Sequence, residues 1–217
     1  ALLVSVTDAL RDEFRSFLPL SAANVITLSN GFDAALFEGP AAARAEHEPW
    51  TVLYAGSTQF RSGLDLANLL CGVDRFAGHM PGGVRVRLMG LFSAQEIPPL
   101  QQAKLELTGW RTRAEVAQSM RQADVLVVLT GNHPSVATTK LFEYIGAARP
   151  ILVVGRQSAA ARIVLEHQLG LVTDDDPASI ARTLGALHAE RETWQARLMS
   201  EAAQRARRTF SRQEQAA

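Results

Sequence analysis

Residues 124–155 read DVLVVLTGNHPSVATTKLFEYIGAARPILVVG, and this stretch decides the fold. It begins with a nearly continuous run of Val and Leu, which is typical of a parallel strand buried on both faces. Residues 131–139 are small and polar and predict a loop, and residues 140–148 predict a helix that Pro150 ends. Ile-Leu-Val-Val then predicts a second buried strand. The loop follows a strand and leads into a helix, which is where open α/β sheets bind ligands.

The start of this predicted helix has the composition of an anion site. Backbone N–H groups in a first helical turn lack partners within the helix, and the dipole places about half a positive charge there. Thr138 and Thr139 add two hydroxyl groups, and Lys140 adds a cation. The sequence therefore predicts that a negatively charged ligand binds at this helix terminus.

Glu143 is an acid among apolar neighbours, one turn into the same helix. It is not part of a capping box, because the residue three positions before it is Lys140 and not Ser or Thr. One interpretation is a solvated acid that the helix start favours. The other is a carboxylate that accepts hydrogen bonds from the hydroxyl groups of a ligand.

The segment KLFEYIGAARPILVV resembles the donor-binding signature of GT-B glycosyltransferases, the large retaining group that uses nucleotide-activated sugars. The resemblance implies the C-terminal, donor-binding half of a GT-B fold, which is a doubly wound, Rossmann-like parallel sheet. It also implies that Glu143 binds the donor ribose and that Lys140 faces the diphosphate, with Leu141 beside them. Many members carry an earlier Glu, to which sugar contacts are attributed, at the position where this chain has Ser135.

A second segment, GSTQFRSG, follows the predicted strand 51–55 and resembles the first phosphate loop of the same family. Gly56 permits close approach of a phosphate or a backbone. Ser57 stands where the family usually has Arg, which leaves Arg61 as the best remaining cation. We therefore expect Arg61 and Lys140 to be the catalytic cations that stabilise the leaving diphosphate.

Two further residues are candidates for the donor site. Trp110 follows a strand predicted at 105–108, and the resemblance places the nucleotide base near this point; Trp110 either stacks on the base or packs in the core. His133 lies in the central loop and either contacts the sugar or is a loop-capping or surface histidine.

The resemblance also divides the chain. The resemblance extends to the segments VSVTDALRDEF and NVITLSNGFD. It implies that residues 1–33 are the tail of an acceptor-binding domain and the interdomain connection. On spacing alone, these residues fit a first βα unit of a single domain equally well. Residues 34–49 are rich in Ala, Glu and Pro and predict a linker. Residues 50–190 are the expected nucleotide-sugar-binding domain. Residues 191–217 are the expected long C-terminal helix. The missing initiator Met suggests a fragment.

Other expected elements complete an alternating α/β pattern. The remaining strands are expected at 2–6, 24–28, 84–89 and 170–173, and further helices at 93–104 and 180–187, with Thr112 capping another. Asp174-Asp175-Asp176-Pro177 has an acidic composition that fits a metal site, but Asp176 as N-cap with Pro177 in the first turn is the better interpretation. The basic end of the chain, residues 205–212, predicts a solvated helix end, with contact to an anionic membrane surface as the alternative.

Bulk composition excludes several functions. The 217 residues carry 22 basic and 22 acidic side chains, which gives no reason to expect nucleic acid as a partner. The single cysteine, Cys71, fits a reducing compartment, and we expect a cytoplasmic protein. No apolar run approaches the ~20 residues of a membrane span. The sequence has no P-loop and no G-x-G-x-x-G, and its histidines lack metal-ligand spacing, so no cofactor or metal is expected.

Together these features predict a glycosyltransferase of the hexosyltransferase type that uses a nucleotide-diphosphate sugar. This chain would bind the donor, and the acceptor, a glycan, lipid or small molecule, would bind to a missing N-terminal domain, so that the isolated chain is inactive. The alternatives are a nucleotide-sugar epimerase of the same fold and a non-catalytic nucleotide-sugar-binding module.

Overall fold

The computed structural model describes residues 2–18, 24–39, 48–57 and 66–216. The strands are β1 (Leu3–Ser5), β2 (Val25–Thr27), β3 (Trp50–Ala55), β4 (Val84–Met89), β5 (Lys104–Gly109), β6 (Val125–Leu129), β7 (Ile151–Val154) and β8 (Gly170–Thr173). The helices are α1 (Asp8–Phe17), α2 (Leu66–Ala77), α3 (Arg113–Gln122), α4 (Thr139–Ala147), α5 (Ala159–Glu166), α6 (Pro177–Ala189), α7 (Arg191–Leu198), α8 (Glu201–Thr209) and α9 (Arg212–Gln215), with the short 3-10 helices η2 (Ala34–Phe37) and η3 (Ala94–Glu96). All eight strands expected from the sequence are present.

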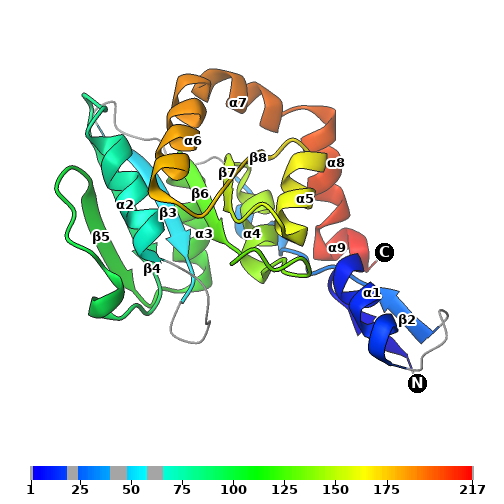
Figure 1. The fold of residues 1–217 in the computed structure, drawn as a ribbon. Coiled ribbons are helices and arrows are strands. Elements are labelled where there is room, and N and C mark those ends of the chain that lie inside the picture. Colours follow the sequence, from blue (N-terminus) through cyan, green and yellow to red (C-terminus); the bar gives the residue numbers. More distant parts are fainter. Residues whose placement is uncertain (1, 19–23, 40–47, 58–65, 217) are drawn as a thin grey trace.

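Six of these strands form a parallel sheet in the order β5-β4-β3-β6-β7-β8. Alternate side chains of each strand enter two apolar cores, because successive residues of a strand point to opposite faces. One core is covered by α2 and α6, and the other by α3, α4, α5 and α8. Helices therefore cover both faces of a parallel sheet (Figure 1), as the doubly wound expectation requires.

The strand order places a topological switch point between β3 and β6. From β3 the chain moves outward to β4 and β5, and it then returns to the other side of β3 to form β6, β7 and β8. At such a point, open α/β sheets form a ligand-binding crevice at the carboxyl ends of the strands. This crevice holds the site described below.

The N-terminal residues form a separate small unit. Strands β1 and β2 pair in parallel with each other and not with the six-stranded sheet, and α1 packs beside them. Figure 1 shows this unit set apart from the main sheet, near the C-terminus of the chain. The connection after β2 is held by the chain end: the N–H of Phe32 donates to the carbonyl of Phe210, and the N–H of Arg212 donates to the carbonyl of Phe32.

Local signals explain most helix boundaries. Thr112 and Glu115 form a capping box at the start of α3. The Asp176 carboxylate accepts the N–H of Ser179 at 2.9 Å, and Pro177 occupies the first turn of α6. The N-cap interpretation of the acidic stretch is therefore confirmed.

The prediction of one long C-terminal helix over residues 191–217 is wrong. Three helices span this region instead, because Ser200 caps a new helix, α8, and accepts the N–H of Ala203 through its hydroxyl oxygen. The basic end is partly internal: the Arg207 guanidinium donates to the carbonyl of Leu198, which caps the end of α7. None of the helices in the described ranges is both long and apolar enough to cross a bilayer.

Two other expectations need correction. The helix expected at 93–104 is only the short turn η3, because Pro98 and Pro99 remove the N–H groups that would continue it. The start of the expected linker is ordered: Ala34–Phe37 forms η2, and Phe37 packs against the core beside α3. Residues 40–47 of that linker lie outside the described residues.

Candidate functional site

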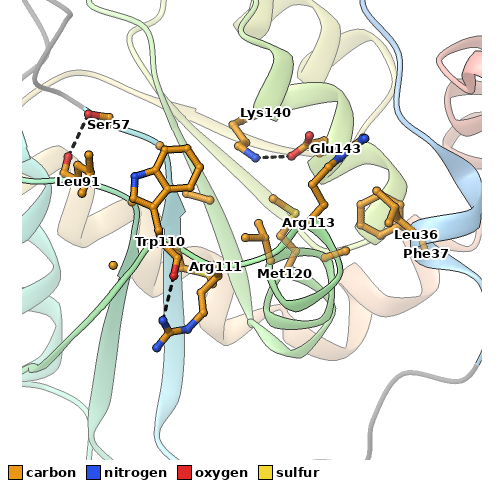
Figure 2. Close-up of a pocket in the computed structure, with 17 residues that line it drawn as sticks. Leu36, Phe37, Ser57, Leu91, Trp110, Arg111, Arg113, Met120, Lys140 and Glu143 are labelled. Atoms are coloured by element: carbon orange, nitrogen blue, oxygen red, sulfur yellow. Dashed lines mark hydrogen bonds and ion pairs between the residues drawn. The ribbon is translucent and has the colours of Figure 1, made fainter.

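A cavity of about 420 Å³ lies at the carboxyl edge of the sheet. One wall consists of residues at or just after the carboxyl ends of three neighbouring strands, namely Gly56, Ser57, Gly90, Leu91, Gly109 and Trp110. Helix α4 contributes Lys140 and Glu143 (Figure 2). Loops that follow adjacent parallel strands meet at one edge, so residues distant in the sequence are gathered into one site.

Lys140 and Glu143 form an ion pair inside this cavity. The Lys140 Nζ lies 2.5 Å from the Glu143 Oε2, and the two side chains are 36% and 19% exposed. They lie three residues apart on α4, and such pairs face each other on a helix surface. The Glu143 side chain is therefore mostly buried and lines the cavity, and its role in binding a ligand stays a prediction.

The N-terminus of α4 opens toward the same crevice. Thr138 has the extended backbone of an N-cap residue, but among the described residues no side chain caps this helix. A second cavity of about 60 Å³, lined by Gly56, Leu129, Thr138 and Lys140 among others, lies beside the first. Uncapped N–H groups and an ammonium group thus lie next to an opening about the size of a small anion.

The turn after β3 fits closely against the turn after β4. The N–H of Gly56 donates to the carbonyl of Met89, and the Ser57 hydroxyl donates to the carbonyl of Leu91 at 3.0 Å. Gly90 has φ +137°, and a Cβ atom there would lie 1.9 Å from the carbonyl oxygen of Gly56. Only glycine permits this approach, so Gly90 sets the path of the Gly56 turn.

We expect Gly90→Ala to destabilise the fold by about 2–5 kcal/mol, because it combines a disfavoured backbone conformation with a clash against main-chain atoms. For a domain of this size each kcal/mol lowers the melting temperature by roughly 2–4 °C. Gly82→Ala is the matched control, since a Cβ there meets nothing within 4 Å. Thermal unfolding of both variants checks this prediction, and equal melting temperatures would contradict it.

Away from Lys140 and the N-terminus of α4, the cavity is lined mainly by apolar side chains. Leu36 and Phe37 of η2 line it together with Val116 and Met120 of α3. Trp110 lies on the rim and is 77% exposed, so it is not a core residue. This end of the cavity therefore offers an apolar surface with an exposed indole ring beside it.

Two arginines add positive charge to the cavity wall. Arg111 donates to the carbonyl of Trp110, and Arg113 is the first residue of α3. Figure 2 shows Arg113 extending toward the part of α4 that carries Glu143. Within the described part of the chain, the Arg113 side chain has no ion pair or hydrogen bond.

Tyr144 joins α4 to the sheet behind the cavity. Its side chain is fully buried, and its hydroxyl oxygen accepts the N–H of Ala55 at 2.9 Å. Burial raises the pKa of the Tyr144 phenol above its usual range. The group is therefore a neutral hydroxyl at every physiological pH.

The other residues expected in the donor site lie as follows. The side chain of Leu141 is buried in the core, and its N–H donates to the carbonyl of Thr138. His133 and Thr139 are exposed and line neither cavity, and the carbonyl of Ser135 accepts the hydroxyl of Thr7 at 2.9 Å. Arg61 lies outside the described residues. The roles expected for these residues stay predictions.

Several lining residues were not expected from the sequence. The signal for Gly90 was present, since it ends a predicted strand just as Gly56 does. Arg113 follows the strand that ends at Gly109 by a few residues, which also places it at the ligand-binding edge. Leu36 and Phe37 had no such signal, because they reach the cavity only through the packing of η2 against α3.

Comparison with protein-family models and with curated proteins gives no match. Solved structures do match the fold. HepE from Anabaena, solved in complex with UDP and glucose, has a TM-score of 0.74 and 17% identity over 97% of this chain. Sucrose-phosphate synthase from Thermosynechococcus elongatus has a TM-score of 0.72 and 16% identity over 98% of this chain. A glycosyltransferase from Rickettsia africae has a TM-score of 0.76 and 11% identity over 99% of this chain.

These matches fix the architecture. The chain has the fold of the C-terminal-like half of GT-B glycosyltransferases, as the sequence resemblance implied. It spans 59% of the HepE chain, 55% of the synthase and 60% of the Rickettsia protein.

Proposed function

We propose that this chain is the donor-binding half of a glycosyltransferase that transfers a hexose from a uridine-diphosphate sugar to an acceptor hydroxyl. One observation carries the proposal: a single cavity at the switch point of a GT-B fold holds a glycine turn, an ammonium group, a carboxylate and an indole ring. The crystal structure of HepE, which shares this fold, contains UDP and glucose.

The diphosphate would bind between the Gly56 turn and the N-terminus of α4. Uncapped N–H groups and Lys140 face this space, and both favour an anion. Among the charged side chains that line the main cavity, Lys140, Arg111 and Arg113 outnumber the one carboxylate of Glu143. The positive charge matches a nucleoside diphosphate, and we therefore include no metal ion in the proposal.

The ribose would bind at Glu143. Its carboxylate has two oxygens, and only one is engaged by Lys140 in the free chain. On binding, the ammonium would turn to the diphosphate, and the carboxylate would accept hydrogen bonds from the two ribose hydroxyls. The ion pair thus keeps two mostly buried charges neutralised until the ligand replaces each partner.

The base would occupy the apolar part of the cavity. Trp110 presents an exposed aromatic face at its rim, and indole rings stack well on flat rings. Leu36 and Phe37 would bound the opposite side. The apolar lining supports a nucleotide rather than a bare phosphosugar as the ligand.

The acceptor would bind to a preceding domain, of which the β1–α1–β2 unit is a part. One face of the β1–β2 sheet is packed by α1, while Leu2, Val4, Ile26 and Leu28 on the other face are each more than 40% exposed. Paired aliphatic residues on a strand face are normally covered. We infer that further chain covers this face in the complete protein.

The chemical step would break the bond between the anomeric carbon and the diphosphate and form a bond from that carbon to the acceptor oxygen. The acceptor hydroxyl would give its proton to a base of the acceptor-binding domain, and the nucleoside diphosphate would leave as an anion. Lys140 and the N–H groups of α4 would stabilise the negative charge that develops on the leaving group. We expect this chemistry in a reducing, cytoplasmic setting, which the single cysteine supports.

An epimerase would need additional carboxylates near the sugar, and Glu143 is the one acidic side chain among the described cavity residues.

Calorimetric titration with UDP, CDP, ADP, GDP, UDP-glucose and uridine tests the proposal. We expect one site that binds UDP and UDP-glucose more tightly than uridine and than the other diphosphates. If no diphosphate binds, or if uridine binds as tightly as UDP, the proposal is wrong.

We expect Lys140→Met to weaken UDP binding at least about tenfold while uridine binding changes little. The variant removes the cation that would face the diphosphate, and it leaves the Glu143 carboxylate without its partner next to that anion. Lys104→Met is the matched control, because Lys104 is exposed and lies at the start of β5, whereas the cavity is lined by Gly109 at the end of that strand. Equal losses for UDP and uridine would mean that Lys140 acts through the structure of α4 instead.

A further inference from the structure

We propose that the buried hydroxyl of Tyr144 is a positioning group that holds the phosphate-binding turn at Gly56 in place. This inference rests on the proposed function, because it concerns how the same site is preorganised for a diphosphate. Tyr144 touches no ligand in this account and is not a catalytic residue.

The first observation is that β3 and β6 separate before they end. Their pairing runs only through Val52 with Val125 and Leu53 with Leu126. Beyond this point β6 continues to pair with β7 on its other side, and the small cavity of about 60 Å³ lies between the ends of β3 and β6. The last residues of β3 therefore lack a strand on one side.

The second observation concerns the direction of the backbone N–H groups of β3. Those of Trp50 and Gly56 donate to carbonyls on the β4 side, at Gly83 and Met89. Because alternate residues of a strand point their N–H groups to opposite neighbours, that of Ala55 points toward β6. The separation of the strands would leave it unpaired and buried, which is unfavourable in a protein interior.

Tyr144 fills this gap. Its hydroxyl oxygen lies 2.9 Å from the Ala55 nitrogen, and both residues are buried. The same solution occurs at the other end of β3, where the Asp124 carboxylate accepts the N–H of Thr51 at 2.6 Å. Side chains thus replace the missing strand at each end of the β3–β6 pair.

The hydrogen bond between Ala55 and Tyr144 joins two segments of the proposed donor site. Ala55 directly precedes Gly56, and Tyr144 directly follows Glu143. One helix therefore carries the proposed diphosphate cation and the ribose carboxylate on one side, and on the other side a hydroxyl bonded to the root of the phosphate turn. Because a turn that is already ordered need not lose freedom on binding, this bond should favour the diphosphate specifically.

The test is Tyr144→Phe, which removes the hydroxyl and keeps the ring that fills the core. We expect UDP affinity to fall about tenfold, because the unpaired Ala55 N–H releases the turn, and uridine affinity to stay the same. Ile180→Val, in the core on the opposite face of the sheet, controls for a general loss of stability and should change neither affinity. Calorimetry measures all three proteins against both ligands.

The outcomes separate the two proposals. If the unmodified chain does not bind UDP, the proposed function itself fails. If it binds UDP, and Tyr144→Phe weakens UDP and uridine equally or weakens neither, the positioning role is overturned. Should the variant not fold, amide hydrogen exchange of Ala55 in the unmodified chain decides: slower exchange with UDP but not with uridine supports the role, and no difference contradicts it.

Discussion

Incubated with UDP-sugars and a broad panel of acceptors, these 217 residues are expected to bind donor and to form no glycosylated product. The proposed site would bind only the donor, and the chain spans 59% of the HepE chain. Holding two substrates together contributes up to ~7–11 kcal/mol to such a reaction. A chain that lacks the acceptor side forfeits this contribution, although slow hydrolysis of the donor remains open to it.

Mass spectrometry of the acceptor panel measures transfer, and release of UDP measures hydrolysis. Slow UDP release that Glu143→Ala abolishes would show that the cavity supports chemistry, which separates an enzyme half from a non-catalytic binding module. Efficient transfer by these residues alone would show that the acceptor site lies within them, and the domain assignment would then be wrong.

Glu143→Ala is expected to weaken UDP binding by at least about tenfold. Hydrogen bonds to a charged group contribute roughly 1.5–3 kcal/mol each, and the carboxylate would accept two from the ribose. The melting temperature should change little, because the ion pair lost with Lys140 is partly exposed. Unlike Lys140→Met, this variant should weaken uridine as much as UDP, since both carry the ribose.

Glu166→Ala is the matched control for this variant, because Glu166 is an exposed acid at the end of α5 with no ion pair in the described part of the chain. Calorimetry with UDP and with uridine measures the affinities of both variants, which are compared with those of the unmodified chain. Unchanged binding by Glu143→Ala would return Glu143 to the interpretation of an acid that only favours the start of its helix.

The central stretch was predictable because its signals are local. Strand β6, helix α4 and strand β7 could be predicted from the sequence alone. Their signals are a run of Val and Leu, a polar loop, a segment of helical composition and Pro150 at its end. The same logic located Gly56 and Ser57 at the end of β3. Residues that line a ligand site at strand ends can therefore be found wherever a strand and its following turn are clear.

Other features depend on tertiary packing and had no local signal. Phe37 reaches the cavity because η2 packs on α3, about 80 positions later in the chain. Tyr144 had the composition of a core residue, and its bond to Ala55 follows only from the separation of β3 and β6. The prediction of one long C-terminal helix was wrong although a local signal was present. Ser200 is an N-cap residue that begins a new helix, but the helical composition on both sides of it predicted a continuous helix.

A crystal structure of the chain with UDP tests the central claim most directly. The account predicts the ribose hydroxyls within hydrogen-bonding distance of the Glu143 carboxylate, and the diphosphate between Gly56 and the N-terminus of α4. It also predicts that Lys140 has left Glu143 for the phosphate oxygens. UDP bound elsewhere, or bound with the Lys140–Glu143 pair still intact, would contradict it.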